Sequence, residues 1–294
     1  MMLMGVSAEA SAASGGSLTA AGGGGDAGQV RVVLSWSGIA GNVDVQRSPQ
    51  GAGSWTTLAT NQVAYTDTAC DTSQTGFTGY WDYRVAATGT TNWSNTATAS
   101  PYVLCDLWSG TAGTNVSGRT PNVSSGGPSS GDTWHLEDGA IDLDGSGDAR
   151  NNSTSESIAV SNTGASDLTL VSSVKFSSFP SSNGLYIRGR DTDVNNGWIM
   201  GIESSGDKLN LYKQQSGSYT SMASTTGVGG STGTFYGLTL TLSGTSITGS
   251  TPQNSKSVGP VTSSFNQTAT RCGFQSEQGT SQTGFFGIVT ATSP

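Results

Sequence analysis

The chain has 294 residues, of which 33% are hydrophobic and only 11% charged, and its formal net charge is −8. An acidic chain without a Lys/Arg cluster is poorly suited to nucleic acid, because binding to phosphates depends on neutralising cations. No apolar run reaches the roughly 18 residues of a membrane-spanning helix, so we expect neither nucleic acid nor membrane as a partner.

The chain opens with a Gly-, Ala- and Ser-rich segment over residues 1–28, which ends in GGGGDAG. Its start, MMLMGVSAEASAAS, lacks the positive n-region and the roughly 7–15-residue apolar core of a secretory signal peptide. A segment with so few apolar side chains becomes ordered when another chain holds it. We therefore predict that residues 1–28 form an N-terminal anchoring arm.

Short alternating segments follow at about ten-residue spacing, which is typical of an immunoglobulin-like β-sandwich. They read VRVVLSWSG, NVDVQRS, SWTTLAT, AYTDT, YWDYRVAAT and SNTATAS. The ordered set L-S-W, V-x-V-x-R-S, S-W-T-x-L, Y-T-D-T, Y-x-Y-R-V-x-A and W-S-N resembles a fibronectin type III module. That resemblance implies a sandwich over residues 29–102, with Trp36 and Tyr83 as its core aromatics.

Residues 185–224 alternate apolar and polar side chains between clusters of Asp, Asn, Gly and Ser. This pattern predicts antiparallel strands joined by tight turns. Leu209 and Leu211 share one face of their strand, and Asn210 and Tyr212 share the other. A sheet with one apolar face buries it against a second sheet, so we predict another β-sandwich.

Three motifs of this half resemble the concanavalin A-like (laminin-G-like) jelly-roll module. They are WSGTAGTNVSGRTP, GLYIRGRDTDVNNGW and KLNLYK, in that order. The resemblance implies a jelly roll over residues 103–294. The predicted fold class is therefore all-β, with two tandem antiparallel β-sandwiches and an extended N-terminal arm.

Catalytic residues are hard to find in the sequence. Jelly-roll glycosidases need two carboxylates facing one cleft, and the family's catalytic version carries an E-x-D-x-x-E strand. The five glutamates, at positions 9, 137, 156, 203 and 277, do not have that spacing. The single histidine, His135, follows Trp134 at the start of a strand, where a structural role is expected. We predict that the protein is not an enzyme.

Two features concern metals and sulfur. In IDLDGSGDAR, Asp142, Asp144 and Asp148 surround two glycines, and such a loop is either a hairpin turn or a Ca²⁺ site. No other cofactor is predicted.

Cys70, Cys105 and Cys272 lack the C-x-x-C spacing, so we expect reduced structural cysteines, with a Cys70–Cys105 bridge as the alternative.

Sugar recognition is the binding chemistry that the second half favours. Aromatic rings stack on sugar faces, and nearby polar side chains bind hydroxyls. Tyr186, Arg188 and Arg190 share one face of their strand, and Tyr212 alternates away from its leucines. These four form the predicted glycan-binding set, with a merely structural role as the alternative. Trp198 has the parity of Met200 and Ile202, which favours the core.

The arm, the tandem sandwiches and the absence of a catalytic set together resemble phage virion surface proteins. The predicted function is a non-enzymatic outer capsid decoration or head or tail fibre subunit at the virion surface. Its predicted partners are other virion proteins, copies of itself through residues 1–28, and host-surface glycans. The alternative is a secreted or cell-surface bacterial carbohydrate-binding or adhesion protein, or an extracellular filament subunit.

Overall fold

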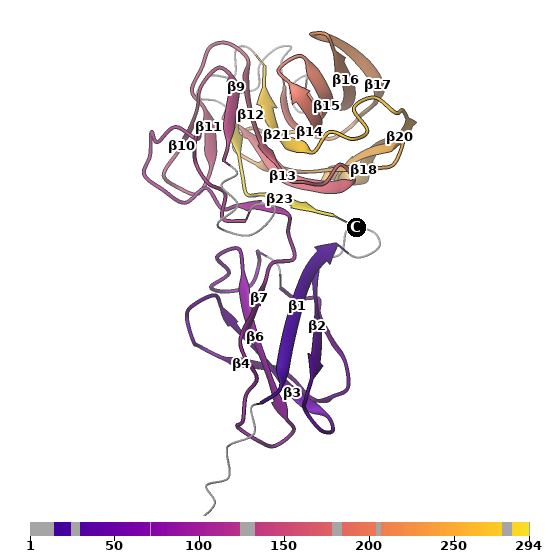
Figure 1. Ribbon diagram of the computed structural model, residues 1–294. Coiled ribbons are helices and arrows are strands. Elements are labelled where there is room, and N and C mark those ends of the chain that lie inside the picture. The colour runs from indigo at the N-terminus through magenta and orange to yellow at the C-terminus, as the bar shows by residue number, and fades with distance from the viewer. Residues whose placement is uncertain are drawn as a thin grey trace, which may run out of the picture. The chain divides into compact units, whose positions relative to one another are not determined.

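The computed structural model describes residues 15–24, 30–70, 72–123, 133–177, 184–203, 207–277 and 284–293. Apart from a 3₁₀ turn at Gln253–Ser255, the regular elements of these residues are β-strands arranged in antiparallel sheets. The strands belong to two compact units, β1 to β7 and β8 to β23 (Figure 1). The predicted all-β class with antiparallel β-sandwiches is confirmed. No helix in the described part of the chain is long and apolar enough to span a membrane.

The first unit is a sandwich of a three-stranded and a four-stranded sheet. The first sheet has the order β1 (Ser17–Gly24), β2 (Val30–Ser37) and β5 (Tyr65–Asp67). The second has the order β4 (Thr56–Gln62), β3 (Val43–Pro49), β6 (Trp81–Ala87) and β7 (Ala97–Ala99). Alternate residues of β3 such as Val43 and Val45 are buried, as the two-residue period of a strand requires.

The core aromatics of this unit differ in part from the prediction. Tyr83 is fully buried, and its hydroxyl donates a hydrogen bond to Asp67 over 3.0 Å. Trp36 is only half-buried, so its prediction as a core aromatic is wrong. Trp81 takes that place: it is buried, donates its indole N–H to the Cys70 carbonyl over 2.9 Å, and lies beneath the guanidinium of Arg47.

The predicted arm over residues 1–28 also needs correction. Ser17–Gly24 is a strand of the three-stranded sheet, with Leu18 buried. The Leu18 backbone N–H donates a hydrogen bond to the Asn95 side-chain oxygen over 2.8 Å, and the Asn95 side-chain amide donates to the Leu18 carbonyl over 3.0 Å. The first sandwich therefore begins before residue 29. The rest of the predicted arm, residues 1–14 and 25–29, lies outside the described residues.

The second unit contains a seven-stranded sheet. Its order is β17 (Ser218–Thr226), β16 (Lys208–Gln215), β15 (Asn196–Glu203), β14 (Leu185–Asp193), β21 (Arg271–Ser276), β12 (Ser157–Asn162) and β9 (His135–Asp138). Figure 1 shows these strands side by side. The meander predicted over residues 185–224 corresponds to β14 to β17, so this part of the sequence pattern is confirmed.

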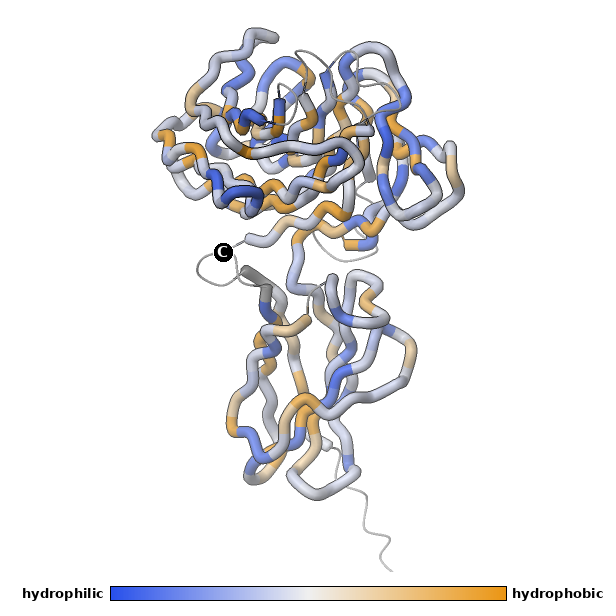
Figure 2. The backbone as a smooth tube through the Cα atoms, turned by 180° about the vertical axis from the view of Figure 1, so that it is seen from behind, coloured by the Kyte–Doolittle hydropathy of each residue, from blue (hydrophilic) through white to orange (hydrophobic). Residues whose placement is uncertain are grey.

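A nine-stranded sheet accompanies it in the same unit. Its main order is β10 (Ile141–Leu143), β11 (Ala149–Asn151), β22 (Gly284–Phe286), β13 (Leu168–Phe176), β18 (Phe235–Ser243), β19 (Ser246–Thr251) and β20 (Lys256–Thr262). The strand β23 (Val289–Thr292) pairs with β13 and with β8 (Leu104–Asp106). Figure 2 shows hydrophobic and hydrophilic residues interspersed along the backbone.

The core of the second unit combines alternate residues of both sheets. Leu185 and Ile187 from β14 join Leu238 and Leu240 from β18. Trp198 belongs to this core, as its parity indicated. Because one face of each sheet is used in this way, the opposite face of the seven-stranded sheet is left for other roles.

The opening motif of the second unit is explained by one buried carboxylate. Asp106 accepts hydrogen bonds from the Trp108 backbone N–H, the Trp134 indole N–H and the Arg119 guanidinium, at 2.8 to 3.0 Å. Trp108 and Trp134 then pack on Phe274, with ring centroids 5.3 and 5.1 Å away. Trp108 and Arg119 of this motif, together with Trp134 beyond it, therefore hold the fold rather than a ligand.

The three cysteines, Cys70, Cys105 and Cys272, are buried, and each carries a reduced thiol outside any disulfide. Burial raises the pKa of Cys105 and of Cys272 above the ordinary thiol value. The reduced, structural role predicted for them is confirmed, and the alternative Cys70–Cys105 bridge is wrong.

Candidate functional site

The outer face of the seven-stranded sheet, turned away from the core, carries polar side chains on several adjacent strands. Residues that pair directly across neighbouring strands share a face. Tyr186 pairs with Gln275 on one side and Gly201 on the other, and Gly201 pairs with Asn210. Leu185, one residue away, belongs to the core. The four paired residues therefore all lie on the outer face.

We call the residues that meet there the tyrosine–glutamate cluster. Its members are Glu156, Tyr186, Glu203, Asn210, Tyr212, Tyr219, Gln275 and Glu277. They come from five strands and from the start of a sixth, β12, so the cluster exists only when the sheet is assembled.

One half of the cluster is centred on Glu203. The Tyr186 hydroxyl donates to Glu203 Oε1 over 2.5 Å, and the Asn210 amide donates to Glu203 Oε2. The same amide donates to the Tyr212 hydroxyl oxygen over 3.0 Å. Tyr186 and Glu203 are almost fully buried, whereas Tyr212 is half-buried. The buried pair thus supports a tyrosine that reaches the surface.

The other half is centred on Glu156. Tyr219 and Gln275 both donate to Glu156 Oε1, and Gln275 also donates to the Tyr219 hydroxyl oxygen over 2.7 Å. Tyr219 is 38% exposed, one of the more exposed large side chains of the described residues. The rings of Tyr212 and Tyr219 lie edge to face with centroids 6.1 Å apart, which joins the two halves.

Burial shapes the proton affinities of the cluster. It raises the pKa of Glu277 to about 7, helped by the negative charge of Glu203 and opposed by hydrogen bonds from Tyr186 and the Gly184 backbone. Burial also raises the pKa of Tyr186, Tyr212 and Tyr219 above their ordinary value of 10. The three hydroxyls therefore stay protonated at neutral pH and remain hydrogen-bond donors.

This shift predicts how stability depends on pH. Between the ordinary glutamate pKa of 4.5 and about 7, the folded chain binds the Glu277 proton more tightly than the unfolded chain does. The free energy of unfolding should therefore fall as pH rises through this window. Urea titrations at pH 5 and pH 8 measure the difference, and Glu277→Gln should reduce it. An unchanged difference in that variant would contradict the assignment.

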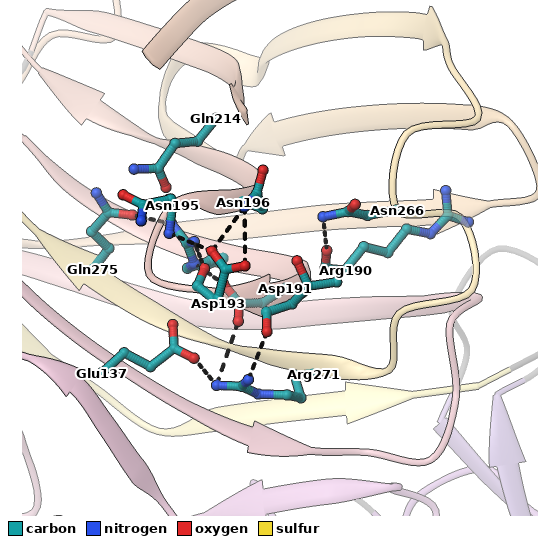
Figure 3. A network of polar contacts seen from close by, with 12 residues as sticks. Glu137, Arg190, Asp191, Asp193, Asn195, Asn196, Gln214, Asn266, Arg271 and Gln275 are labelled. Atoms are coloured by element: carbon teal, nitrogen blue, oxygen red, sulfur yellow. Dashed lines mark hydrogen bonds and ion pairs between the residues drawn. The ribbon is translucent and has the colours of Figure 1, made fainter. Parts of the chain in front are cut away.

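Arg188 lies beneath the cluster as a buried hub. Its Nη1 donates to Gln214 Oε1 over 2.5 Å and to Gln275 Oε1 over 2.8 Å, and its Nε pairs with Asp191. Its Nη2 donates to the Asp193 carbonyl over 2.8 Å. Gln214 lies on β16, Gln275 on β21, and Asp191 and Asp193 on β14, and Figure 3 labels all four. Arg188 is fully buried, so it positions Gln275 instead of contacting a ligand, contrary to the prediction.

Arg190 leaves this face altogether. The register of β14 shifts after Gly189, and Arg190 has a φ of 47°. Its guanidinium therefore turns to the Ser166 carbonyl at 3.0 Å and to Asp167 at 2.8 Å. Figure 3 shows Arg190 extending away from Gln214 and Gln275. Of the predicted glycan-binding set, Tyr186, Arg188 and Tyr212 share a face, and of these Tyr212 is the one that is half-exposed.

The three aspartates of the predicted calcium loop do not converge. Asp142 pairs with Arg150, and Asp148 pairs with Lys175, both at 3.1 Å. Asp144 accepts the backbone N–H groups of its own turn. Among the residues that the structure describes, no group of three or more His, Cys, Asp or Glu side chains is arranged to hold a metal ion. The loop is a turn, and the calcium alternative is not supported.

Sequence reasoning missed Glu156, Glu203, Tyr219 and Glu277. It compared the spacing of glutamates along a single strand, whereas these glutamates lie on β15 and at the ends of β12 and β21. A usable signal was present for Glu203: it lies two residues beyond Gly201, so it has the parity of the polar face in the predicted hairpin.

Comparisons with known proteins give distant likenesses. No protein-family model and no curated protein matches the chain. The carbohydrate-binding module CBM66 from Bacillus subtilis is 17% identical, with a TM-score of 0.44, over 54% of this chain and 95% of that one. The Emp46p carbohydrate recognition domain in its metal-free form is 13% identical, with a TM-score of 0.41, over 55% of this chain and 87% of that one.

A third likeness extends over both units. It is to a mutant of the GH43 protein BlXynB from Bacillus licheniformis, which is 11% identical, with a TM-score of 0.46, over 90% of this chain and 63% of that one. At TM-scores below 0.5 and such low identities, these likenesses assign no function to the chain. Any functional conclusion has to come from the geometry of the outer face.

Proposed function

We propose that this chain is a non-enzymatic carbohydrate-binding protein whose ligand docks on the tyrosine–glutamate cluster of the second unit. The supporting observation is the pair Tyr212 and Tyr219, whose rings reach the surface beside the carboxylates of Glu156, Glu203 and Glu277. Aromatic rings present an apolar body to the C–H face of a sugar, and carboxylates accept its hydroxyls.

The hydrogen bonds inside the cluster favour holding a sugar over cleaving it. Glycoside hydrolysis uses one carboxylate as a nucleophile or base and another as an acid. Both oxygens of Glu203 already accept bonds from Tyr186 and Asn210, and Glu156 Oε1 accepts two bonds. An ionised carboxylate has about four lone-pair positions, so each can still accept a sugar hydroxyl.

Such a protein fits a secreted or cell-surface setting, where carbohydrate recognition supports adhesion. The virion prediction depended on an anchoring arm over residues 1–28. Ser17–Gly24 belongs to the first sandwich, and residues 1–14 and 25–29 lie outside the described residues. No observation on the described residues therefore favours a capsid or tail subunit over an adhesion protein.

A glycan array followed by calorimetry tests the proposal with the full chain. We expect a defined group of glycans to bind, and Tyr219→Ala and Tyr212→Ala each to weaken binding about tenfold, or ~1.4 kcal/mol. Tyr65→Ala, which removes a half-buried tyrosine from the first unit, is the matched control and should bind normally. An array without hits, or equal losses in all three variants, would refute the proposal.

A further inference from the structure

A pocket of about 450 Å³ opens where β9, β12 and β21 meet, away from the tyrosine–glutamate cluster. Its lining residues are His135, Glu137, Asn162, Thr270 and Arg271. The volume falls in the range of small-molecule sites. We propose that this pocket is a second sugar-binding subsite, which takes a hydroxyl-bearing unit of the same glycan chain. The inference rests on the proposed function of the cluster.

The strongest observation is an unsatisfied acceptor at the pocket. The Glu137 side chain is only 10% exposed, and its Oε1 pairs with Arg271. Its Oε2 is buried without a hydrogen-bond partner. Figure 3 shows this second oxygen pointing away from Arg271. A buried carboxylate oxygen without a partner costs free energy, which would be recovered if the Glu137 side chain turned this oxygen toward a donor hydroxyl of a ligand in the pocket.

The remaining side chains complement that acceptor with donors. Thr270 donates to the Asn162 carboxamide oxygen over 2.7 Å, and the Gly164 N–H donates to the same oxygen over 3.1 Å. These bonds fix the Asn162 carboxamide so that its amide nitrogen is the group left to donate. His135 is exposed at the rim and adds a ring nitrogen. Alternating donors and acceptors match the hydroxyls of a sugar.

The charges at the pocket favour a neutral ligand over an ion. Arg271 lies between Glu137 and Asp191, whose Oδ1 is 3.6 Å from its guanidinium. Asp191 is in turn paired with the buried Arg188. The two cations and two carboxylates balance, so there is no excess charge to attract a phosphate or a metal ion. The ligand class that fits this pocket is therefore an uncharged molecule rich in hydroxyl groups.

The pocket and the cluster lie on one face of the sheet. Gln275 of the cluster and Arg271 of the pocket are both on β21, and four residues at roughly 3.3 Å each separate them by about 13 Å. Their even spacing places both side chains on the outer face. A glycan that reaches both subsites is therefore longer than a disaccharide, so affinity should increase with chain length.

The single histidine provides a direct reporter of the pocket. We would titrate the full chain with linear manno-, xylo- and gluco-oligosaccharides of one to six units, and follow the His135 ring protons and the tyrosine ring protons by NMR. Long chains should move both sets of signals, and monosaccharides only the tyrosine set. Tyrosine shifts at saturation with unmoved His135 signals overturn the second subsite alone. If neither set moves with any of the sugars, the proposed function fails as well.

Variants separate the two subsites by affinity. Glu137→Gln should weaken binding of hexasaccharides about tenfold and leave monosaccharide binding unchanged, because a lost bond to a charged group acts only on ligands that reach the pocket. Since Glu137→Gln also removes an ion pair, His135→Ala at the exposed rim is the second variant and should show the same length dependence. Equal losses for short and long chains, or no loss for either, would overturn the second subsite.

Discussion

Asp106→Ala is expected to destabilise the second unit by about 3–5 kcal/mol, because it leaves a partly buried cation and two buried donors without their shared acceptor. Asp106 is fully buried, and it binds Arg119, the Trp108 backbone and the Trp134 indole. These two tryptophans support Phe274 in the centre of the core. One substitution should therefore loosen the whole aromatic cluster.

Urea unfolding followed by tryptophan fluorescence measures this loss. The matched control is Asp207→Ala, which removes an exposed aspartate whose side chain forms no hydrogen bond or ion pair within the described residues. The control should change the unfolding free energy by less than 0.5 kcal/mol, as is usual for surface positions (an approximate bound). Equal midpoints for the two variants would show that Asp106 does not hold the fold.

Arg188→Met should have the second large effect, again about 3–5 kcal/mol on the free energy of unfolding. The substitution removes the nearer of the two cations beside the buried Asp191 and the donors to Gln214 and Gln275. Because Gln275 holds both Tyr219 and Glu156, glycan affinity should fall as well. A merely structural arginine would lower stability without changing the affinity of the molecules that remain folded.

The two effects are separable by measurement. Affinity is determined by calorimetry at a temperature where circular dichroism shows the variant to be folded. Arg31→Met, which removes an exposed arginine of the first unit, is the control and should change neither quantity. Wild-type stability in Arg188→Met would contradict the stabilising role of the buried Arg188 contacts. Wild-type affinity in a folded Arg188→Met would contradict the proposal that Arg188 positions Gln275.

Within regular strands, the sequence was sufficient to predict which residues share a face. In β14 and β16, side-chain alternation correctly separated Tyr186 and Tyr212 from the core residues Leu185 and Leu211. The prediction failed at Arg190 for a local reason. The strand shifts register beyond Gly189, and that shift depends on pairing with β15 and β21. A bulge set by pairing with distant strands reverses the facing of a residue, and the sign of it within the segment is Gly189.

The strand β1 was missed for a related reason. Its sequence, SLTAAGGG, contains one large apolar residue, Leu18, and ends in glycines, which have low strand propensity. Pairing with β2 and the side chain of Asn95 hold it in place. Such a strand is created by tertiary contacts, so composition alone suggested an arm.

The glutamates of the site were missed because of where they are in the chain. Glu156, Glu203 and Glu277 are separated by dozens of residues, and they come together only through the strand order β12-β21-β14-β15. Spacing within one segment carries no information about that order. The sequence could indicate sugar binding as a class, but the assembled sheet was needed to identify the residues.

The most direct test of the account is to map a bound glycan on the full chain by NMR. With a glycan that binds, backbone amide shifts should concentrate on the outer face of the seven-stranded sheet, around Tyr212, Tyr219 and Glu277. Shifts confined to the first unit or to the nine-stranded sheet would contradict the central claim, even if the affinity were high.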